Sequence, residues 1–118
     1  MEDVFAWVDY ETYRDKYLIT LEGEALIFSK KPGWVRILFG ALGQMFADYK
    51  EKFRIPLSEV EFITLEDRKK KPPVIQLNTK THGKCYIDFS EYNEIAKMLM
   101  DRFEENSEWV GKRYTIFQ

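Results

Sequence analysis

Few side chains in this sequence are of the types that carry out catalysis. A nucleophilic hydroxyl or thiol needs a base beside it, and that base is usually a histidine. The one histidine, His82, precedes Gly83 in a segment typical of a turn, and the one cysteine, Cys85, falls in an alternating strand pattern. We therefore interpret His82 as a solvent-facing turn residue and Cys85 as a small buried apolar side chain.

Metal binding and phosphate chemistry are not indicated either. One histidine and one cysteine are too few ligands for a zinc site, and Glu59 and Glu61 fit a solvated strand face better than a calcium loop. Gly40 and Gly43 stand among apolar residues, without the lysine of a phosphate-binding loop. We therefore expect no enzyme, no catalytic residue, no metal site and no cofactor.

Length and composition indicate one small domain. A chain of 118 residues fits a single domain, which we place over residues 1–118 with its core at about 15–105. A formal net charge of -2 and the lack of a basic stripe argue against a nucleic-acid partner. One cysteine and an acidic start without a secretion signal favour a cytoplasmic protein.

Alternating apolar patterns predict an antiparallel sheet. A hairpin is predicted from strands at 17–21 and 25–28, around the turn Glu22-Gly23-Glu24. Further strands are predicted at 53–56, 57–65, 75–78 and 85–89.

Two parts of this strand pattern need separate interpretation. Val60 and Phe62 share one face whereas Ile63 and Leu65 share the other, which indicates either a bulge or a strand covered on both faces. The charged, proline-terminated stretch 66–73 is predicted to be a solvated turn.

The two ends of the chain are less regular. Residues 2–14 fit either a strand or a helix, and we favour a short helix. Near the other end, Ser90 is predicted to cap a helix that ends at Asn106-Ser107. Apolar residues at helical spacing would lie on the sheet: Tyr92, Ile95, Ala96, Leu99 and Phe103. Residues 109–118 fit a late strand, a helix extension or an exposed arm.

An apolar segment at 33–47 interrupts the strands. As a helix it would be apolar almost all round, with a narrow stripe of small and polar residues that includes Arg36, Gly40 and Gln44. It is shorter than the roughly 18 to 20 apolar residues that cross a bilayer, and Arg36 interrupts it. Such an apolar segment must be buried against another surface, and three alternatives remain open: the protein's own core, a membrane surface and a second protein chain.

This order of elements resembles the pleckstrin-homology-like domains, especially their small bacterial and GRAM-type members. The resemblance covers about residues 17–103 and rests on three phrases: Tyr17-Leu18-Ile19-Thr20, Ala25-Leu26-Ile27-Phe28 and Ile55-Pro56-Leu57-Ser58-Glu59-Val60. It implies an α+β fold, mainly β, in which a bent antiparallel sheet forms a half-open barrel, a hydrophobic helical insert interrupts it and a C-terminal helix caps one end.

Phosphoinositide binding in that family relies on basic residues across the first strand-strand loop. Here the first predicted turn is Glu22-Gly23-Glu24, which repels phosphate. Many members of the fold bind proteins instead, and we favour that interpretation for this chain.

Two hypotheses for function follow from these patterns. The first is a non-catalytic module whose insert docks a protein partner or a copy of itself through Trp34, Phe39, Met45 and Phe46. The second is a peripheral module at the inner face of the membrane, where Lys30, Lys31 and Arg36 contact anionic lipids. A small apolar ligand inside the half-barrel is the third and least supported interpretation.

Overall fold

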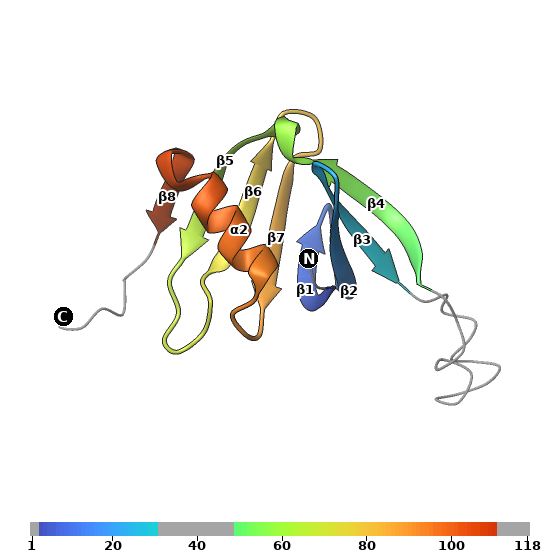
Figure 1. Ribbon diagram of the computed structural model, residues 1–118, viewed down its shortest axis with the longest axis horizontal. Helices are drawn as coiled ribbons and strands as arrows, with labels where there is room; N and C mark the ends of the chain where they lie inside the picture. The colour runs from blue at the N-terminus through green and yellow to red at the C-terminus, as the bar shows by residue number, and fades with distance from the viewer. Residues whose placement is uncertain (1–2, 31–48, 111–118) are drawn as a thin grey trace.

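Residues 3–30 and 49–110 are described by the computed structural model, and their strands form one open eight-stranded sheet (Figure 1). The strand order is β4-β3-β2-β1-β7-β6-β5-β8. Neighbouring strands are antiparallel except for β5 and β8, which are parallel. The fold class is α+β and mainly β, as the sequence predicts. The insert at 33–47 lies outside the described residues.

The element bounds follow the chain in a simple order. They are β1 (Val4–Tyr10), β2 (Tyr13–Glu22), β3 (Ala25–Lys30), β4 (Lys50–Pro56), the 3-10 turn η1 (Leu57–Glu59), β5 (Val60–Glu66), β6 (Val74–Thr79), β7 (Lys84–Phe89), α2 (Glu94–Arg102), η2 (Glu104–Asn106) and β8 (Ser107–Val110).

Strand β1 occupies the N-terminal segment for which we favoured a short helix, so that prediction is wrong. Its side chains alternate: Ala6 and Val8 are buried, whereas Phe5 and Trp7 are 48% and 45% exposed. β1 pairs with β2 on one side and with β7 on the other. It therefore joins the two halves of the sheet, and the core begins before residue 15.

The hairpin of β2 and β3 is confirmed. Gly23 has φ +61 in its turn, a left-handed conformation that glycine adopts without a steric penalty. The alternation predicted for the later hairpin is confirmed as well, because Ile75, Leu77 and Ile87 are fully buried on one face.

A bulge, one of the two alternatives for the phase change in β5, is present. The register with β6 shifts between Val60 and Phe62. Val60, Ile63 and Leu65 are therefore all buried on the core side, while Phe62 is 39% exposed.

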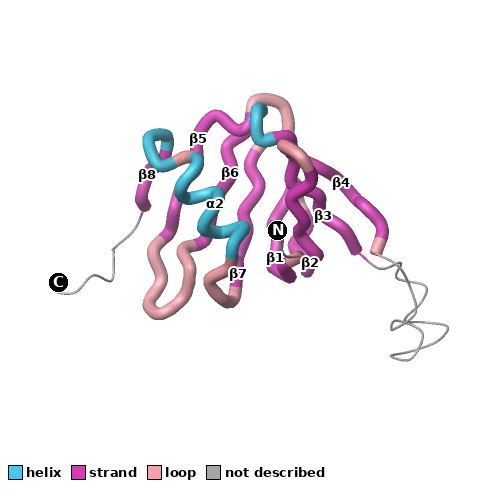
Figure 2. Tube along the Cα trace, in the orientation of Figure 1, coloured by secondary structure: helices cyan, strands magenta, loops and turns pink. Residues whose placement is uncertain are grey.

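Helix α2 lies across the β5–β7 half of the sheet (Figures 1 and 2). Its buried residues are Ile95, Ala96 and Leu99. The cap is Asn93, whose side chain accepts from the Ala96 amide at 2.8 Å, so the prediction of Ser90 as the cap is wrong. Tyr92 precedes the helix and is 67% exposed, and it therefore does not belong to the apolar stripe.

The chain after α2 returns to the sheet. The helix ends at Arg102 rather than at Asn106-Ser107, and η2 leads into β8. Residues 109 and 110, the described part of the tail, thus take the strand conformation among the alternatives left open for it. In the part of the chain that the structure describes, no helix is long and apolar enough to span a bilayer.

Candidate functional site

The insert starts and ends at adjacent positions of the sheet. β3 and β4 are neighbouring antiparallel strands, and Lys30 at the end of one pairs with Lys50 at the start of the other. The connection between them runs over residues 31–49, although about two to five residues suffice for such a hairpin. Loops longer than about 12–15 residues are uncommon in compact domains and usually have a function.

Of the residues predicted to contact a partner or a membrane, the structure describes Lys30. The others lie outside the described residues: Trp34, Phe39, Met45, Phe46, Lys31 and Arg36. The Lys30 ammonium forms an ion pair with the Asp15 carboxylate and lies 5.6 Å from the centre of the Tyr17 ring. Its positive charge is therefore compensated within the domain.

Beside the start of the insert lies a hollow of about 390 Å³ with an aromatic floor. The Phe53 ring stacks on Tyr10 at 4.3 Å and on Phe28 at 4.4 Å between ring centres. Tyr17 meets Phe53 edge to face at 5.5 Å. Burial raises the pKa of two of the tyrosines that line the hollow, Tyr10 and Tyr17. Both phenols are therefore neutral at physiological pH.

Charges of both signs line the rim of this hollow. They are Glu11, Arg14, Asp15, Lys30 and Lys52. Three cations and two carboxylates are present there, so the rim does not form a single-sign field that would select an anion.

The sequence prediction missed this hollow because it missed β1. The first hairpin turn is at residues 11–12, between β1 and β2, and not at Glu22-Gly23-Glu24. The latter turn lies at the opposite end of β2, where Glu24 binds Arg102 at 2.7 Å. The alternation of Val4, Ala6 and Val8 was the signal for β1. From the sequence, an acidic first turn is expected to repel phosphate. In the structure, that acidic turn, Glu22-Gly23-Glu24, is the second turn of the sheet.

The base of the insert also contacts the outer face of the sheet. Tyr49, which directly precedes β4, lies against Phe5 of β1 with 5.8 Å between ring centres. Lys16 lies 5.7 Å from the Phe5 ring, and Arg14 lies 5.5 Å from the Trp7 ring. The outer face of the sheet beside the C-terminal end of the insert thus carries aromatic rings with cationic side chains next to them.

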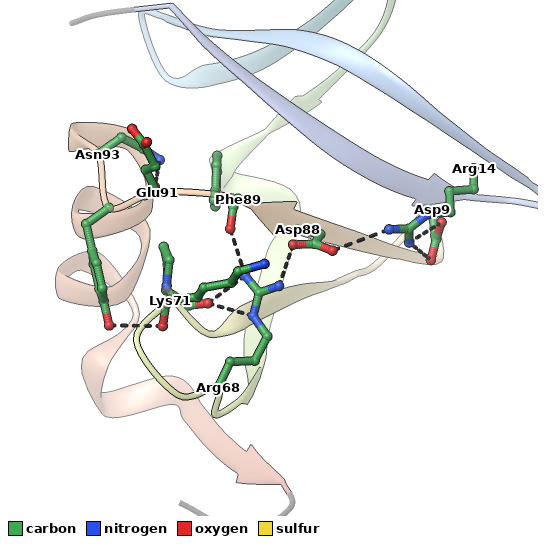
Figure 3. Close-up of polar contacts among 10 residues, drawn as sticks. Asp9, Arg14, Arg68, Lys71, Asp88, Phe89, Glu91 and Asn93 are labelled. Atoms are coloured by element: carbon green, nitrogen blue, oxygen red, sulfur yellow. Dashed lines mark hydrogen bonds and ion pairs between the residues drawn. The ribbon is translucent and has the colours of Figure 1, made fainter. Parts of the chain in front are cut away.

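A chain of alternating charges crosses the outer face of β2, β1 and β7 (Figure 3). Arg14 binds Asp9 at 3.0 Å and Asp88 at 3.3 Å, and Asp88 in turn binds Arg68 at 2.6 Å. Two arginines and two aspartates offset one another, so this chain links the strands without adding net charge.

Arg68 shows that the stretch at 66–73 is more than a solvated turn, which corrects the sequence prediction. Its side chain is 21% exposed, and it donates to the carbonyl oxygens of Pro72 and Phe89, each at 2.7 Å. Pro72 and Pro73 are buried. The loop is fixed to the sheet because buried carbonyl groups need donors.

His82 lies in the turn between β6 and β7, where its side chain is 30% exposed and also forms a polar cluster with its neighbours. Its Nδ1 lies 2.6 Å from the Glu59 carboxylate and 3.1 Å from the Thr81 hydroxyl. Both contacts use the same ring nitrogen, whereas a proton relay between a hydroxyl and a carboxylate needs both nitrogens. A hydrogen bond from Thr81, at 2.7 Å, lowers the pKa of Glu59. The arrangement is that of a structural cluster.

Cys85 is buried, as the sequence predicts. Burial raises the pKa of its thiol to about 12, so the nucleophilic thiolate is disfavoured. Within residues 3–30 and 49–110, no three side chains of histidine, cysteine, aspartate or glutamate come together as a metal site requires.

Comparison with known proteins gives no family. The chain matches no family model, and a search of curated proteins finds no match. The functional argument therefore rests on the residues of this chain.

Proposed function

We propose that this chain is a non-catalytic, pleckstrin-homology-like interaction module that binds a protein partner through the insert between β3 and β4. The observation that carries this proposal is the length of that connection, residues 31–49, between strands whose ends are already paired at Lys30 and Lys50. A long apolar connection that the hairpin does not need is expected to serve a contact.

The arrangement of the strands supports the pleckstrin-homology-like part of the proposal. Four strands, β1 to β4, and three strands, β5 to β7, are joined through the pairing of β1 with β7. A helix then lies on the sheet (Figure 1). Strand β8, which follows the helix, is an addition to that plan.

The core that the described elements form also supports a role for the insert outside the core. The inward faces of β1 to β7 and the buried side of α2 make one continuous apolar cluster. Phe28, Phe89 and Leu99 in this cluster are fully buried. The described strands and helix thus share one apolar cluster, and the proposal assigns the apolar residues of the insert to a partner.

A protein partner is favoured over a lipid surface because of the ion pair at the start of the insert. Asp15 compensates the charge of Lys30, which leaves Lys31 and Arg36 of the three predicted cations. Each cation near an anionic membrane contributes about 1 kcal/mol, and such an attraction alone does not hold a protein stably at a surface.

A vesicle experiment separates the two partners. With Trp7→Phe and Trp109→Phe, Trp34 becomes the only tryptophan and reports on the insert. The protein interpretation predicts no blue shift and no co-sedimentation with neutral or anionic vesicles. Salt-sensitive binding to anionic vesicles alone would instead support the membrane interpretation.

A photo-crosslinking amino acid placed at Phe39 in intact cells identifies a protein partner directly. We expect one dominant adduct of defined mass. The matched control is the same amino acid at Tyr92, which is 67% exposed and lies outside the insert, and it should give no such adduct. Equal adducts from both positions would contradict the proposal.

A further inference from the structure

The 3-10 turn η1, which connects β4 to β5, is joined to the turn between β6 and β7 at one end of the sheet (Figure 1). The Glu59 carbonyl in η1 accepts a hydrogen bond from the Lys80 amide at 3.0 Å. The Glu59 carboxylate accepts one from the Thr81 hydroxyl at 2.7 Å and lies 2.6 Å from Nδ1 of His82. Main-chain and side-chain contacts of one residue therefore hold the β6–β7 turn against η1.

The charge states of this pair follow from its geometry. An ionised carboxylate only accepts hydrogen bonds, so the short contact places a proton on Nδ1 of His82. The other ring nitrogen, Nε2, is then the one that gains or loses a proton. The hydrogen bond from Thr81 lowers the pKa of Glu59, so this carboxylate is ionised at neutral and mildly acidic pH. A change of pH in that range therefore alters the charge of the ring and leaves its partner ionised.

We propose that His82 forms a pH-dependent contact within the fold, in which protonation at Nε2 converts its hydrogen bond with Glu59 into an ion pair that holds the β6–β7 turn more tightly against η1. Histidine side chains ordinarily change charge between about pH 8 and pH 5, and hydrogen bonds between charged groups are stronger than neutral ones. A further charged group that acts on this carboxylate is Lys80, in the same turn, and lysine side chains stay charged throughout that range. The contact is therefore tight in mildly acidic solution and loosens as the pH rises.

This contact is independent of the proposed function. The insert begins and ends at Lys30 and Lys50, whereas η1 follows the opposite end of β4. The side chains of His82 and Glu59 are 30% and 33% exposed. Solvent therefore weakens the ion pair, and we expect protonation to change the stability of the turn by a few-fold rather than by orders of magnitude.

Amide hydrogen exchange of the full chain, measured by NMR, tests this proposal. The Lys80 amide reports on the contact because it donates to Glu59. Its protection, relative to an unstructured peptide at the same pH, should be about threefold greater at about pH 5.5 than at about pH 8. The Ala96 amide, which donates to the Asn93 side chain at the start of α2, is the reference and should show no such difference.

His82→Gln provides the matched variant, because its side-chain amide can still donate to Glu59 but does not titrate. His82 is the only histidine of the chain, so the protection of the Lys80 amide in this variant should be equal at the two pH values. Protection in the wild type that is equal or lower at the acidic pH, or a difference that persists in His82→Gln, would overturn the proposal.

Discussion

The Arg68 guanidinium joins the loop before β6 to the end of β7, because it donates both to the Asp88 carboxylate at 2.6 Å and to the Phe89 carbonyl at 2.7 Å. Arg68→Met removes these donors and leaves a partly buried carboxylate and carbonyl groups without them. We expect the free energy of unfolding, measured by urea denaturation, to fall by about 2 kcal/mol.

Arg14 provides the matched control for this variant. It binds the same carboxylate from the other side at 3.3 Å, but its side chain is 52% exposed. Arg14→Met should therefore cost less than about 1 kcal/mol. An equal decrease in the free energy of unfolding for Arg68→Met and Arg14→Met would show that burial of Arg68 does not determine how much it stabilises the fold.

The start of α2 gives a second prediction. Asn93 accepts a hydrogen bond from the Ala96 amide, so Asn93→Ala should lower the free energy of unfolding by about 1 kcal/mol. Ser90 lies before the helix, and Ser90→Ala should change it by less than about 0.5 kcal/mol. If thermal or urea denaturation showed a larger loss of stability for Ser90→Ala than for Asn93→Ala, Ser90 would be the cap.

Where a segment buries one face, its spacing alone was enough to predict the strand. Ile75, Leu77 and Ile87 are examples, because a period of two fits them and a helix does not. In β1 the residues Val4, Ala6 and Val8 fit a period of two, whereas Val4, Trp7 and Val8 fit helical spacing, and the pairing of β1 with β2 and β7 decided between the two patterns. Pairing with β7 is a contact between residues far apart in the sequence, and the local spacing of apolar residues does not predict it.

The remaining differences have similar causes. Ser90 and Asn93 are both good caps, and the sequence does not show which one meets a free amide. Arg68 stands in a run of charges typical of a solvated loop, and two of its partners, Asp88 and Phe89, come from β7, about 20 positions later. β8 is a strand because it pairs with β5, a contact that four residues cannot specify locally.

The cluster around Glu59 predicts a pH effect. The hydrogen bond from Thr81, together with the nearby His82, lowers the pKa of Glu59 below its ordinary value of 4.5. A lowered pKa means that the ionised carboxylate stabilises the fold above the unfolded pKa, and that this contribution is lost as pH falls through the folded pKa. Thr81→Val should raise the pKa of Glu59 in an NMR titration and reduce this acid dependence. An unchanged pKa of Glu59 would contradict the assignment.

Cys85 provides a test of core integrity. Because burial raises its pKa to about 12, the native protein should react with a disulfide reagent at neutral pH only when it unfolds. Labelling should therefore follow the unfolding rate and become fast in denaturant. Rapid labelling of the native protein would show that β7 opens locally.

The most direct test of the account is the stability of a chain in which an Asn-Gly turn replaces residues 31–49 and links Lys30 to Lys50. Because the described strands and α2 form their own core, the account predicts that this variant folds and that its free energy of unfolding is equal to the wild type or higher by up to about 2 kcal/mol. If the shortened chain folds, the loss of the crosslinked adduct in cells is caused by the missing insert and not by unfolding. A loss of more than about 4 kcal/mol, as large as that of a major core truncation, would show that the insert belongs to the protein's own core and would contradict its role as a docking segment.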